Sequence, residues 1–200
     1  MRGVSESGGT PLLLASTSVH RQRLLERFGL PFECVAPAVE ETRLAGEAPQ
    51  AMAARLARAK ALDVARQRGD AVVIGSDQVA VRGAEILGKP GDAERCRAQL
   101  AASSGGELVF LTAVCVATAG GARIREHTDR TTVQLRDLGD AEIARYVERD
   151  RPWDCAGGFK GESLGAALVS RIETVDPTAL TGLPLIWLAD VLRGCGFSVP

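Results

Sequence analysis

The stretch VVIGSDQVAVRGAEILGKP, residues 72–90, decides the fold of this chain. Val72–Ile74 is an apolar, β-branched run that predicts a buried strand. The polar segment Gly75–Gln78 interrupts this run, and alternating valines then resume it. A tight turn at Arg82–Ala84 and a return strand beginning at Ile86–Leu87 complete the pattern of a β-hairpin.

The predicted hairpin sets an acid opposite a base. In a hairpin centred on Gly83, Asp77 pairs with Lys89, because the two residues are equidistant from the centre. A carboxylate at the end of a buried strand loses hydration, and such a group typically has a charged ligand or partner. The pair therefore indicates either a ligand-binding site or a plain ion pair at a strand end, and this stretch alone favours neither.

The composition indicates a soluble globular protein. The 200 residues, 46% hydrophobic and 24% charged, suffice for one α/β domain, which we expect over residues 11–200. Residues 1–10 are polar and glycine-rich without a signal-peptide pattern, so we expect a disordered leader on a cytoplasmic protein. The net charge of −1 argues against nucleic acid or a membrane as partner, and no run approaches the roughly 18 apolar residues of a membrane span.

The cysteine and histidine content limits the kinds of metal site that we expect. The five cysteines are scattered and contain no Cys-x-x-Cys pair, so they indicate a reducing compartment and small buried hydrophobic residues rather than disulfides or a zinc site. His20 and His127 are the only histidines, which excludes an imidazole-rich centre. A bound metal is therefore expected to be a hard cation held by oxygen ligands.

A hydroxyl-rich turn joins a predicted strand to a predicted helix near the start of the chain. Leu12–Ala15 is an apolar run of strand length, Ser16–Ser18 follows it, and helical spacing then continues to Phe28. Ser18 is the expected N-cap, and Arg21 lies in the first helical turn. Because backbone N–H groups at a helix start attract anions, the turn is interpreted as a phosphate site, with a plain helix cap as the alternative.

Other charged residues have roles that the local sequence leaves open. A long helix is predicted from Pro49 to Gly69, and Lys60 lies within its apolar stripe, where it either extends to solvent or reaches a buried anion. Glu41 follows a short strand predicted over residues 32–36, and Glu162 lies in the glycine-rich segment 155–165. Taken alone, these two acids are more typical of solvated loops.

The rest of the chain shows regular secondary-structure patterns. They predict helices over residues 93–103 and 141–148, the latter capped by Asp140, a hairpin of residues 108–118 and 123–135, a strand over 166–172 and a last helix from Pro184 to about Leu192.

Several of these segments together resemble the Maf family of nucleotide pyrophosphatases. The resemblance covers most of the chain from Leu12 to Leu192, and its most specific elements are Ser-x-Ser-x-x-Arg, Gly-Ser-Asp with a downstream Gly-Lys-Pro, and a late Gly-Leu-Pro. The matching segments are LLLASTSVHRQRLLERFGLPFEC, VEET, ARLARAKA, GSDQVAVRGAEILGKP, CAGGFKGESLG and DPTALTGLPL. The resemblance implies an α/β fold of the Maf/ITPase type, in which a mixed twisted sheet with flanking helices forms two lobes around a central cleft.

The resemblance also implies an enzyme that cleaves nucleoside triphosphates between the α and β phosphates and releases pyrophosphate. It assigns phosphate binding to Ser16, Ser18, Arg21, Lys60 and Lys89. Asp77 is the implied catalytic residue, which orients or deprotonates the attacking water. Asp77 and Glu41 are implied to bind a divalent cation, Mg²⁺ or Mn²⁺, as the cofactor.

Three positions distinguish the branches of the family by base preference, and here they are His20, Gln78 and Glu162. Gln78 and Glu162 resemble the branch that acts on 7-methyl-GTP, whereas the dTTP/UTP branch typically has Arg, Thr and Gln at the three positions. A carboxylate at Glu162 also suits the positive charge of a methylated guanine. The 7-methyl-GTP branch usually has Pro and Trp where this chain has Val19 and His20, so a smaller ring is available for stacking on the base.

Two alternatives to 7-methyl-GTP hydrolysis stay open. One is a dTTP/UTP pyrophosphatase of the same family, and the other is a nucleotide-binding protein that regulates septum formation in cell division with little catalysis. The combination of Asp77 with Arg21, Lys60 and Lys89 favours retained chemistry. Members of the family are often dimers, so the resemblance is also compatible with a homodimer.

Overall fold

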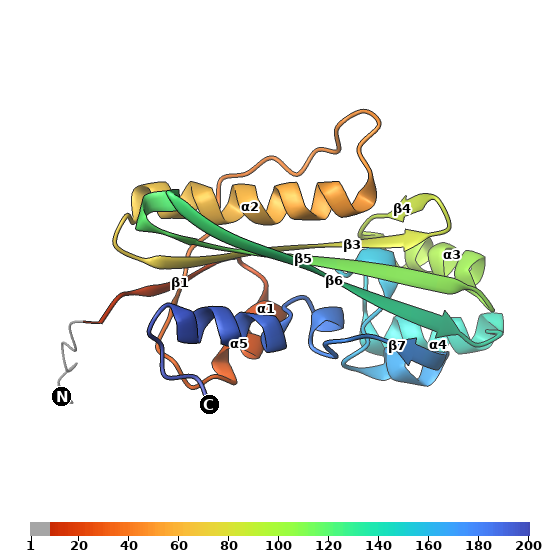
Figure 1. Ribbon diagram of the computed structural model, residues 1–200. Helices are drawn as coiled ribbons and strands as arrows, with labels where there is room; N and C mark the ends of the chain where they lie inside the picture. Colours follow the sequence, from red (N-terminus) through yellow and green to blue (C-terminus); the bar gives the residue numbers. More distant parts are fainter. Residues whose placement is uncertain (1–8) are drawn as a thin grey trace.

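One seven-stranded sheet runs through the protein. The computed structural model describes residues 9–200, so nearly all of the leader expected over residues 1–10 lies outside the described residues. The strand order is β2-β1-β3-β5-β6-β7, with β4 pairing β3 (Figure 1). The strands are β1 (Leu12–Ala15), β2 (Glu33–Cys34), β3 (Val72–Arg82), β4 (Glu85–Leu87), β5 (Glu107–Thr118), β6 (Arg123–Leu135) and β7 (Val169–Glu173). Because β1 pairs β2 and β3 in parallel while the other pairs are antiparallel, the sheet is mixed, as predicted.

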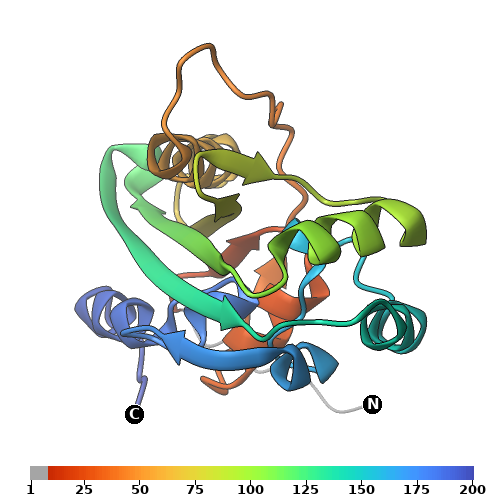
Figure 2. The same ribbon diagram turned by 90° about the vertical axis from the view of Figure 1, so that its right-hand side faces the viewer.

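Helices cover both faces of this sheet. Helix α2 lies along one face, whereas α1 and α5 lie on the other, and Figure 2 shows the twisted sheet between them. Helices α3 and α4 lie together at one end of the sheet, beside the start of β5 and the end of β6. The helices are α1 (Val19–Glu26), α2 (Pro49–Gln67), α3 (Ala93–Ser103), α4 (Asp140–Asp150) and α5 (Leu185–Gly194). None of the helices within residues 9–200 combines the length and the apolar character needed to cross a membrane.

Strand β3 has an interrupted edge. Strand β5 pairs one edge of β3 from Val73 to Val81, so β1 and β4 share the opposite edge. On that edge β1 pairs β3 as far as Gly75, and β4 pairs it again only from Ala80. Residues 76–79 of β3 therefore have no strand beside them on this edge within the described chain. Ligands commonly bind in such a crevice beyond the carboxyl end of a parallel strand.

The alternation of side chains along β3 assigns Asp77 and Gln78, two of the polar residues at this gap, to opposite faces. Val73 and Val79 pack in the core under α2, and Asp77 shares their face. Val72 and Ile74 pack in the core with α1 and α5, and Gln78 shares that face. Within the polar segment 75–78, the carboxylate of Asp77 therefore lies on the α2 side of the sheet, and the amide of Gln78 lies on the side of α1 and α5.

Gly75 allows α2 to pack against β3 at backbone distance. A Cβ atom at this position would lie 2.4 Å from the backbone oxygen of Ala57 and 2.5 Å from the backbone nitrogen of Ala61. Only glycine fits such a contact, because the neighbouring atoms belong to the backbone of the helix. The close contact holds α2 next to the polar segment of β3, so that Lys60 of α2 lies beside Asp77 of β3.

The predicted hairpin is correct in outline and wrong in register. The pairs Arg82↔Glu85 and Ala80↔Leu87 centre the turn between Gly83 and Ala84 rather than on Gly83. The ladder ends at Leu87, and Asp77 pairs with Ala113 of β5 instead of facing Lys89. The symmetric count fails because the return strand is only three residues long and the following segment leaves the sheet before it passes Asp77.

Other elements differ from the prediction mainly at their ends. The strand predicted over residues 32–36 keeps only the two residues of β2, and the one predicted from 166 begins at Val169 after a short 3₁₀ turn. Helix α4 has Gly139 as its N-cap, and Asp140 is the first helical residue rather than the cap. All five cysteines are free, as their scatter predicted.

Candidate active site

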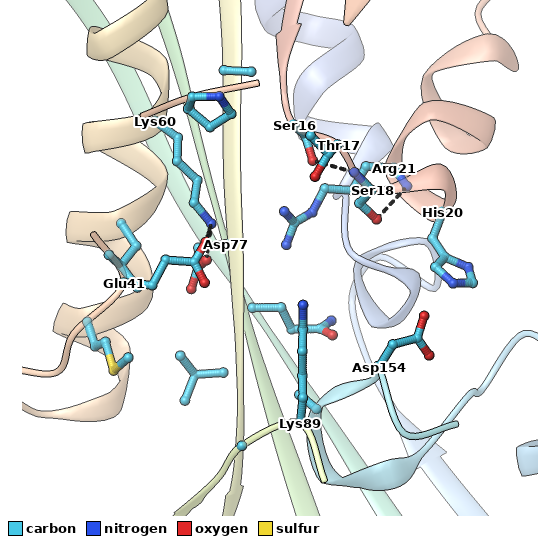
Figure 3. A pocket seen from close by; sticks show the side chains of 18 of the residues that line it. Ser16, Thr17, Ser18, His20, Arg21, Glu41, Lys60, Asp77, Lys89 and Asp154 are labelled. Carbon is cyan, nitrogen blue, oxygen red and sulfur yellow. Dashed lines mark hydrogen bonds and ion pairs between the residues drawn. The ribbon is translucent and has the colours of Figure 1, made fainter. Parts of the chain in front are cut away.

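A cavity of about 620 Å³ lies at the gap beside β3. Figure 3 shows it between two groups of side chains: the carboxylate wall, formed by Glu41, Lys60 and Asp77, and the serine–arginine wall, formed by Ser16, Ser18 and Arg21. All of the predicted site residues except Glu162 line this cavity. They are Ser16, Ser18, His20, Arg21, Glu41, Lys60, Asp77, Gln78 and Lys89.

The serine–arginine wall is the turn between β1 and α1. The Ser18 N–H donates to Ser16 Oγ at 3.1 Å, and the Arg21 N–H donates to Ser18 Oγ at 3.4 Å. Ser18 is therefore the N-cap, as predicted, and its hydroxyl satisfies one backbone donor of the first helical turn. The remaining donors and the positive end of the helix lie beside the cavity, which makes the turn suitable for an anion.

Among residues 9–200, the side chain of Arg21 is anchored at one nitrogen only. Its Nε donates to the carbonyl oxygen of Gly182 at 3.1 Å, and the guanidinium extends into the cavity in Figure 3. Burial lowers the pKa of Arg21, while the negative charges of Asp77 and Glu41 act in the opposite direction. A partly desolvated guanidinium with free N–H groups is a strong partner for a phosphate.

On the carboxylate wall, one lysine joins two acids. Lys60 is buried, and its Nζ lies 2.7 Å from Asp77 Oδ1 and 2.5 Å from Glu41 Oε1. Asp77 is buried as well, whereas the side chain of Glu41 is 58% exposed. Of the two interpretations of Lys60, the buried anion is confirmed, and the anion is Asp77.

The two carboxylates differ in acidity. Burial raises the pKa of Asp77, and the charge and hydrogen bond of Lys60 only partly offset this rise. For Glu41, partial burial acts to raise the pKa, but the hydrogen bond from Lys60 and the charges of Lys60, Lys89 and Arg21 outweigh it and lower the pKa. Asp77 is therefore the better proton acceptor of the two, and Glu41 the more permanent anion.

Lys89 stands apart from both walls. Its side chain points up into the space between them in Figure 3, and it forms no ion pair with the described residues. Its charge still contributes to lowering the pKa of Glu41. The pairing of Asp77 with Lys89 that the hairpin predicted is thus replaced by the Asp77–Lys60 pair, and Lys89 keeps a free ammonium group at the cavity.

A loop on the opposite face of β3 holds Gln78 in place. The Gln78 Nε2 donates to the carbonyl oxygens of Ala179 and Leu180 at 3.1 and 3.0 Å and to Thr112 Oγ1 at 2.9 Å. These acceptors fix the orientation of the amide. The Gln78 carbonyl oxygen has no hydrogen-bond partner among residues 9–200, so the side chain offers the cavity an acceptor rather than a donor.

His20 and Glu162 form a pair at the edge of the cavity. His20 Nδ1 lies 3.0 Å from Glu162 Oε1, with side-chain exposures of 33% and 31%. Glu162 contacts His20 rather than lining the cavity itself. Glu162 therefore reaches the site through the histidine of α1, whereas Ala156 of the same glycine-rich segment lines the cavity directly.

Comparison with known proteins identifies the family. The family described as Maf-like protein matches residues 11–195. The chain belongs to the Maf family. A protein of Alkalilimnicola ehrlichii named 7-methyl-GTP pyrophosphatase is 51% identical over 189 residues, which is 94% of this chain and 95% of that protein. Proteins of the same name from Xanthomonas axonopodis pv. citri and Aromatoleum aromaticum are 51% and 49% identical over 94% of this chain and over 98% and 97% of their own lengths.

Some residues around the site of this Maf-family chain were missed from the sequence. Thr17 and Asp154 line the cavity, and Asp154 could have been noticed because it directly precedes the glycine-rich segment. Asp176 is buried and accepts hydrogen bonds from the Thr178 and Ile186 N–H groups at 2.8 and 2.7 Å. It thereby supports the loop whose carbonyl groups hold Arg21 and Gln78.

Proposed function

We propose that this Maf-family protein is a nucleoside triphosphate pyrophosphatase whose preferred substrate is 7-methyl-GTP. The names of its relatives, at about half identity over nearly their full lengths, support the activity. The observation that carries the proposal is the arrangement of the cavity, where a buried carboxylate on one wall faces an anion-binding turn on the other.

The serine–arginine wall and Lys89 bind the triphosphate in this proposal. The β1–α1 turn offers backbone N–H groups, Arg21 offers guanidinium N–H groups, and Lys89 adds an unpaired ammonium. These groups neutralise the negative charge that repels a nucleophile from the phosphates. Positioning and electrostatic stabilisation are the main contributions that a protein makes to phosphoryl transfer.

Asp77 activates the water. One water molecule adds across the α–β anhydride bond, so the products are the nucleoside monophosphate and pyrophosphate, and Asp77 accepts a proton from that water. The raised pKa of Asp77 makes it a stronger base than an ordinary carboxylate, while Lys60 keeps it ionised. Lys60 also orients the carboxylate through its hydrogen bond to Oδ1.

The residues on the carboxylate wall fit a divalent cation. Glu41 and Asp77 already converge on a positive charge, the Lys60 ammonium, and both offer the oxygen ligands that Mg²⁺ and Mn²⁺ prefer. These two residues would hold such a cation, which would supply positive charge to stabilise the charge developing on the phosphates. Glu41 is the more exposed of the two acids that contact Lys60, so it would be the more accessible ligand.

Three residues favour a methylated guanine as the base. The free carbonyl oxygen of Gln78 can accept a hydrogen bond from a guanine N–H group. His20 offers a ring for stacking, and the carboxylate of Glu162 beside it favours a positively charged base. Thymine and uracil carry no positive charge, so this pair favours them less.

A nucleotide panel tests the proposal. Purified protein is incubated with 7-methyl-GTP, GTP, dTTP or UTP in the presence of Mg²⁺ or Mn²⁺, and pyrophosphate and orthophosphate are quantified separately. We expect pyrophosphate as the only phosphate product and the highest kcat/KM for 7-methyl-GTP. Preference for dTTP or UTP would contradict the base assignment, and release of orthophosphate would contradict the reaction. Tight nucleotide binding without turnover would instead support a regulatory nucleotide-binding protein.

A further inference from the structure

A second cluster of metal-ligating side chains lies at the edge of the cavity. One ligand atom each from His20, Asp154 and Cys155 lies within 4.8 Å of the other two. His20 and Asp154 also line the cavity, and Figure 3 shows the Asp154 carboxylate directed toward the His20 ring. This set differs in chemistry from the carboxylate wall, because it contains an imidazole and a thiol.

The contact between His20 and Glu162 suits a metal-binding histidine. A histidine that binds a metal almost always donates its other ring N–H to a carboxylate or a carbonyl group. Glu162 occupies this position, 3.0 Å from His20 Nδ1. With Nδ1 facing Glu162, Nε2 is the ring nitrogen left for a metal, and it has no hydrogen-bond partner among residues 9–200.

We propose that His20, Asp154 and Cys155 form a zinc-binding site at the mouth of the cavity, with Glu162 orienting the histidine. Imidazole, thiolate and carboxylate together suit Zn²⁺, whereas Mg²⁺ and Mn²⁺ prefer oxygen ligands alone. With metal–ligand bonds of about 2.0–2.3 Å, ligand atoms around zinc lie roughly 3.3–3.8 Å apart. Cys155 Sγ already lies 3.6 Å from Asp154 Oδ1, and the remaining pairs, which lie within 4.8 Å, approach by up to about 1 Å when zinc binds. Exposed and half-buried side chains such as these can make this adjustment by rotation.

Two local charges affect the affinity for zinc. The Lys160 Nζ lies 3.8 Å from Asp154 Oδ1 and weakens the attraction of a cation, although its hydrogen bonds to the Asp150 and Arg151 carbonyl groups hold it to the end of α4. The Cys155 thiol donates to Asp154 Oδ1, with Sγ 3.6 Å away, so the thiol carries its proton before a metal binds. Zinc binding therefore forms a Zn–S bond and releases the thiol proton to solvent.

Zinc at this site would join two separate elements across the cavity mouth. His20 belongs to α1, whereas Asp154 and Cys155 precede the glycine-rich segment. A metal that ties these elements together restricts the entry and release of nucleotide, so we expect zinc to inhibit turnover. Only this inhibition rests on the proposed pyrophosphatase activity, because zinc binding itself does not require it.

Metal binding is measured directly with Co²⁺ and Zn²⁺. The protein is stripped with a chelator, and Co²⁺ is added to wild type, to Cys155→Ser and to the control Cys34→Ser, which changes an exposed cysteine of β2. We expect a thiolate-to-cobalt charge-transfer band in wild type and in Cys34→Ser, and its loss in Cys155→Ser. Zinc affinity, from competition with a chromophoric chelator, should fall by at least about 10-fold in Cys155→Ser and by roughly 10–100-fold in Glu162→Gln.

The Asp77→Asn variant separates this site from the carboxylate wall. It removes a carboxylate expected to bind Mg²⁺ or Mn²⁺, and it should keep the cobalt band and the zinc affinity of wild type. A cobalt band that persists in Cys155→Ser, or zinc binding that is lost in Asp77→Asn alone, would overturn the proposal. In turnover assays with Mg²⁺, inhibition by Zn²⁺ should require at least about 10-fold more metal in Cys155→Ser than in wild type.

Discussion

The two walls of the cavity are built in different ways. The carboxylate wall is built on regular secondary structure. Asp77 lies in the middle of β3, and Lys60 lies on α2, which packs against the backbone of β3 because Gly75 has no side chain. The serine–arginine wall rests on a turn, and Arg21 is anchored to the carbonyl group of Gly182 in another loop. The first wall is charged and already paired, whereas the second presents unpaired donors. We therefore expect substitutions in the first wall to affect the chemical step and those in the second to affect substrate binding.

The largest effect is expected for Asp77→Asn. The asparagine has the same shape and can still accept a hydrogen bond from Lys60, but it cannot take a proton from water. Loss of a general base reduces kcat by about 10²–10⁴-fold. Pyrophosphate release measured at saturating nucleotide gives this change in kcat, and circular dichroism with thermal unfolding checks that the fold is retained.

Asp129→Asn is a matched control for that variant. Asp129 is also a buried carboxylate on a central strand, β6, and burial raises its pKa as well, but it does not line the cavity. Its replacement should leave kcat within the range of wild type. Wild-type pyrophosphate release by Asp77→Asn would remove Asp77 from the catalytic role, whatever the control shows.

Arg21→Ala should have the next largest effect, and this effect should be on KM rather than on kcat. Arg21 provides free guanidinium N–H groups at the cavity, and a hydrogen bond to a charged group contributes about 1.5–3 kcal/mol, which corresponds to roughly 10–100-fold in KM. Arg23→Ala removes an exposed arginine from the same helix and should leave KM unchanged. If Arg21→Ala lowered kcat alone and kept the wild-type KM, the division of roles between the two walls would be wrong.

The sequence predicted most of the fold because its signals are local. The apolar runs of β1 and β3, the proline at the start of α2 and the glycine turn between β5 and β6 each define an element from a few adjacent residues. The cap at Ser18 follows from the same kind of local rule. The ends of β2, β7 and α4 were less accurate, because tertiary packing decides where a short element stops.

The site was predicted as a set of residues and not as a set of contacts. The resemblance to the family identified the residues that line the cavity, but the pairing of Asp77 with Lys89 came from counting along a hairpin. The actual partner, Lys60, lies on a helix that reaches Asp77 only because Gly75 has no side chain. Such a contact depends on the packing of a helix on a sheet, which spacing along the chain does not encode.

A third prediction tests how Lys60 controls the acidity of Asp77. The Lys60 charge is the largest influence that lowers the pKa of Asp77 against the effect of burial. In Lys60→Met this influence is lost, so the pKa of Asp77 rises further. Because Asp77 must be ionised to accept a proton, the acidic limb of the kcat/KM profile should move to higher pH. The activity of Lys60→Met at neutral pH should fall by less than that of Asp77→Asn or Arg21→Ala.

Arg58→Met is the control for the Lys60 variant. Arg58 lies on the same helix, but its partner is Glu126 outside the cavity, so its loss should leave the pH profile unchanged. An acidic limb at the wild-type position in Lys60→Met would show that the limb reports a group other than Asp77. Restoration of the wild-type limb in Lys60→Arg would support an effect of charge rather than of packing.

The smallest effect is expected for Glu162→Gln, which lies outside both walls. Its contact with His20 is partly exposed, and exposed polar contacts of this kind contribute about 0.2–1 kcal/mol, so the preference for 7-methyl-GTP over GTP should fall by up to about fivefold. Glu148→Gln removes an exposed carboxylate from α4 and should leave this ratio unchanged. Relative kcat/KM values across 7-methyl-GTP, GTP, dTTP and UTP measure the effect, and an unchanged ratio in Glu162→Gln would exclude Glu162 from base selection. Because the residue acts through His20, a loss of preference should be accompanied by little change in kcat for GTP, which separates selection of the base from the chemistry at Asp77.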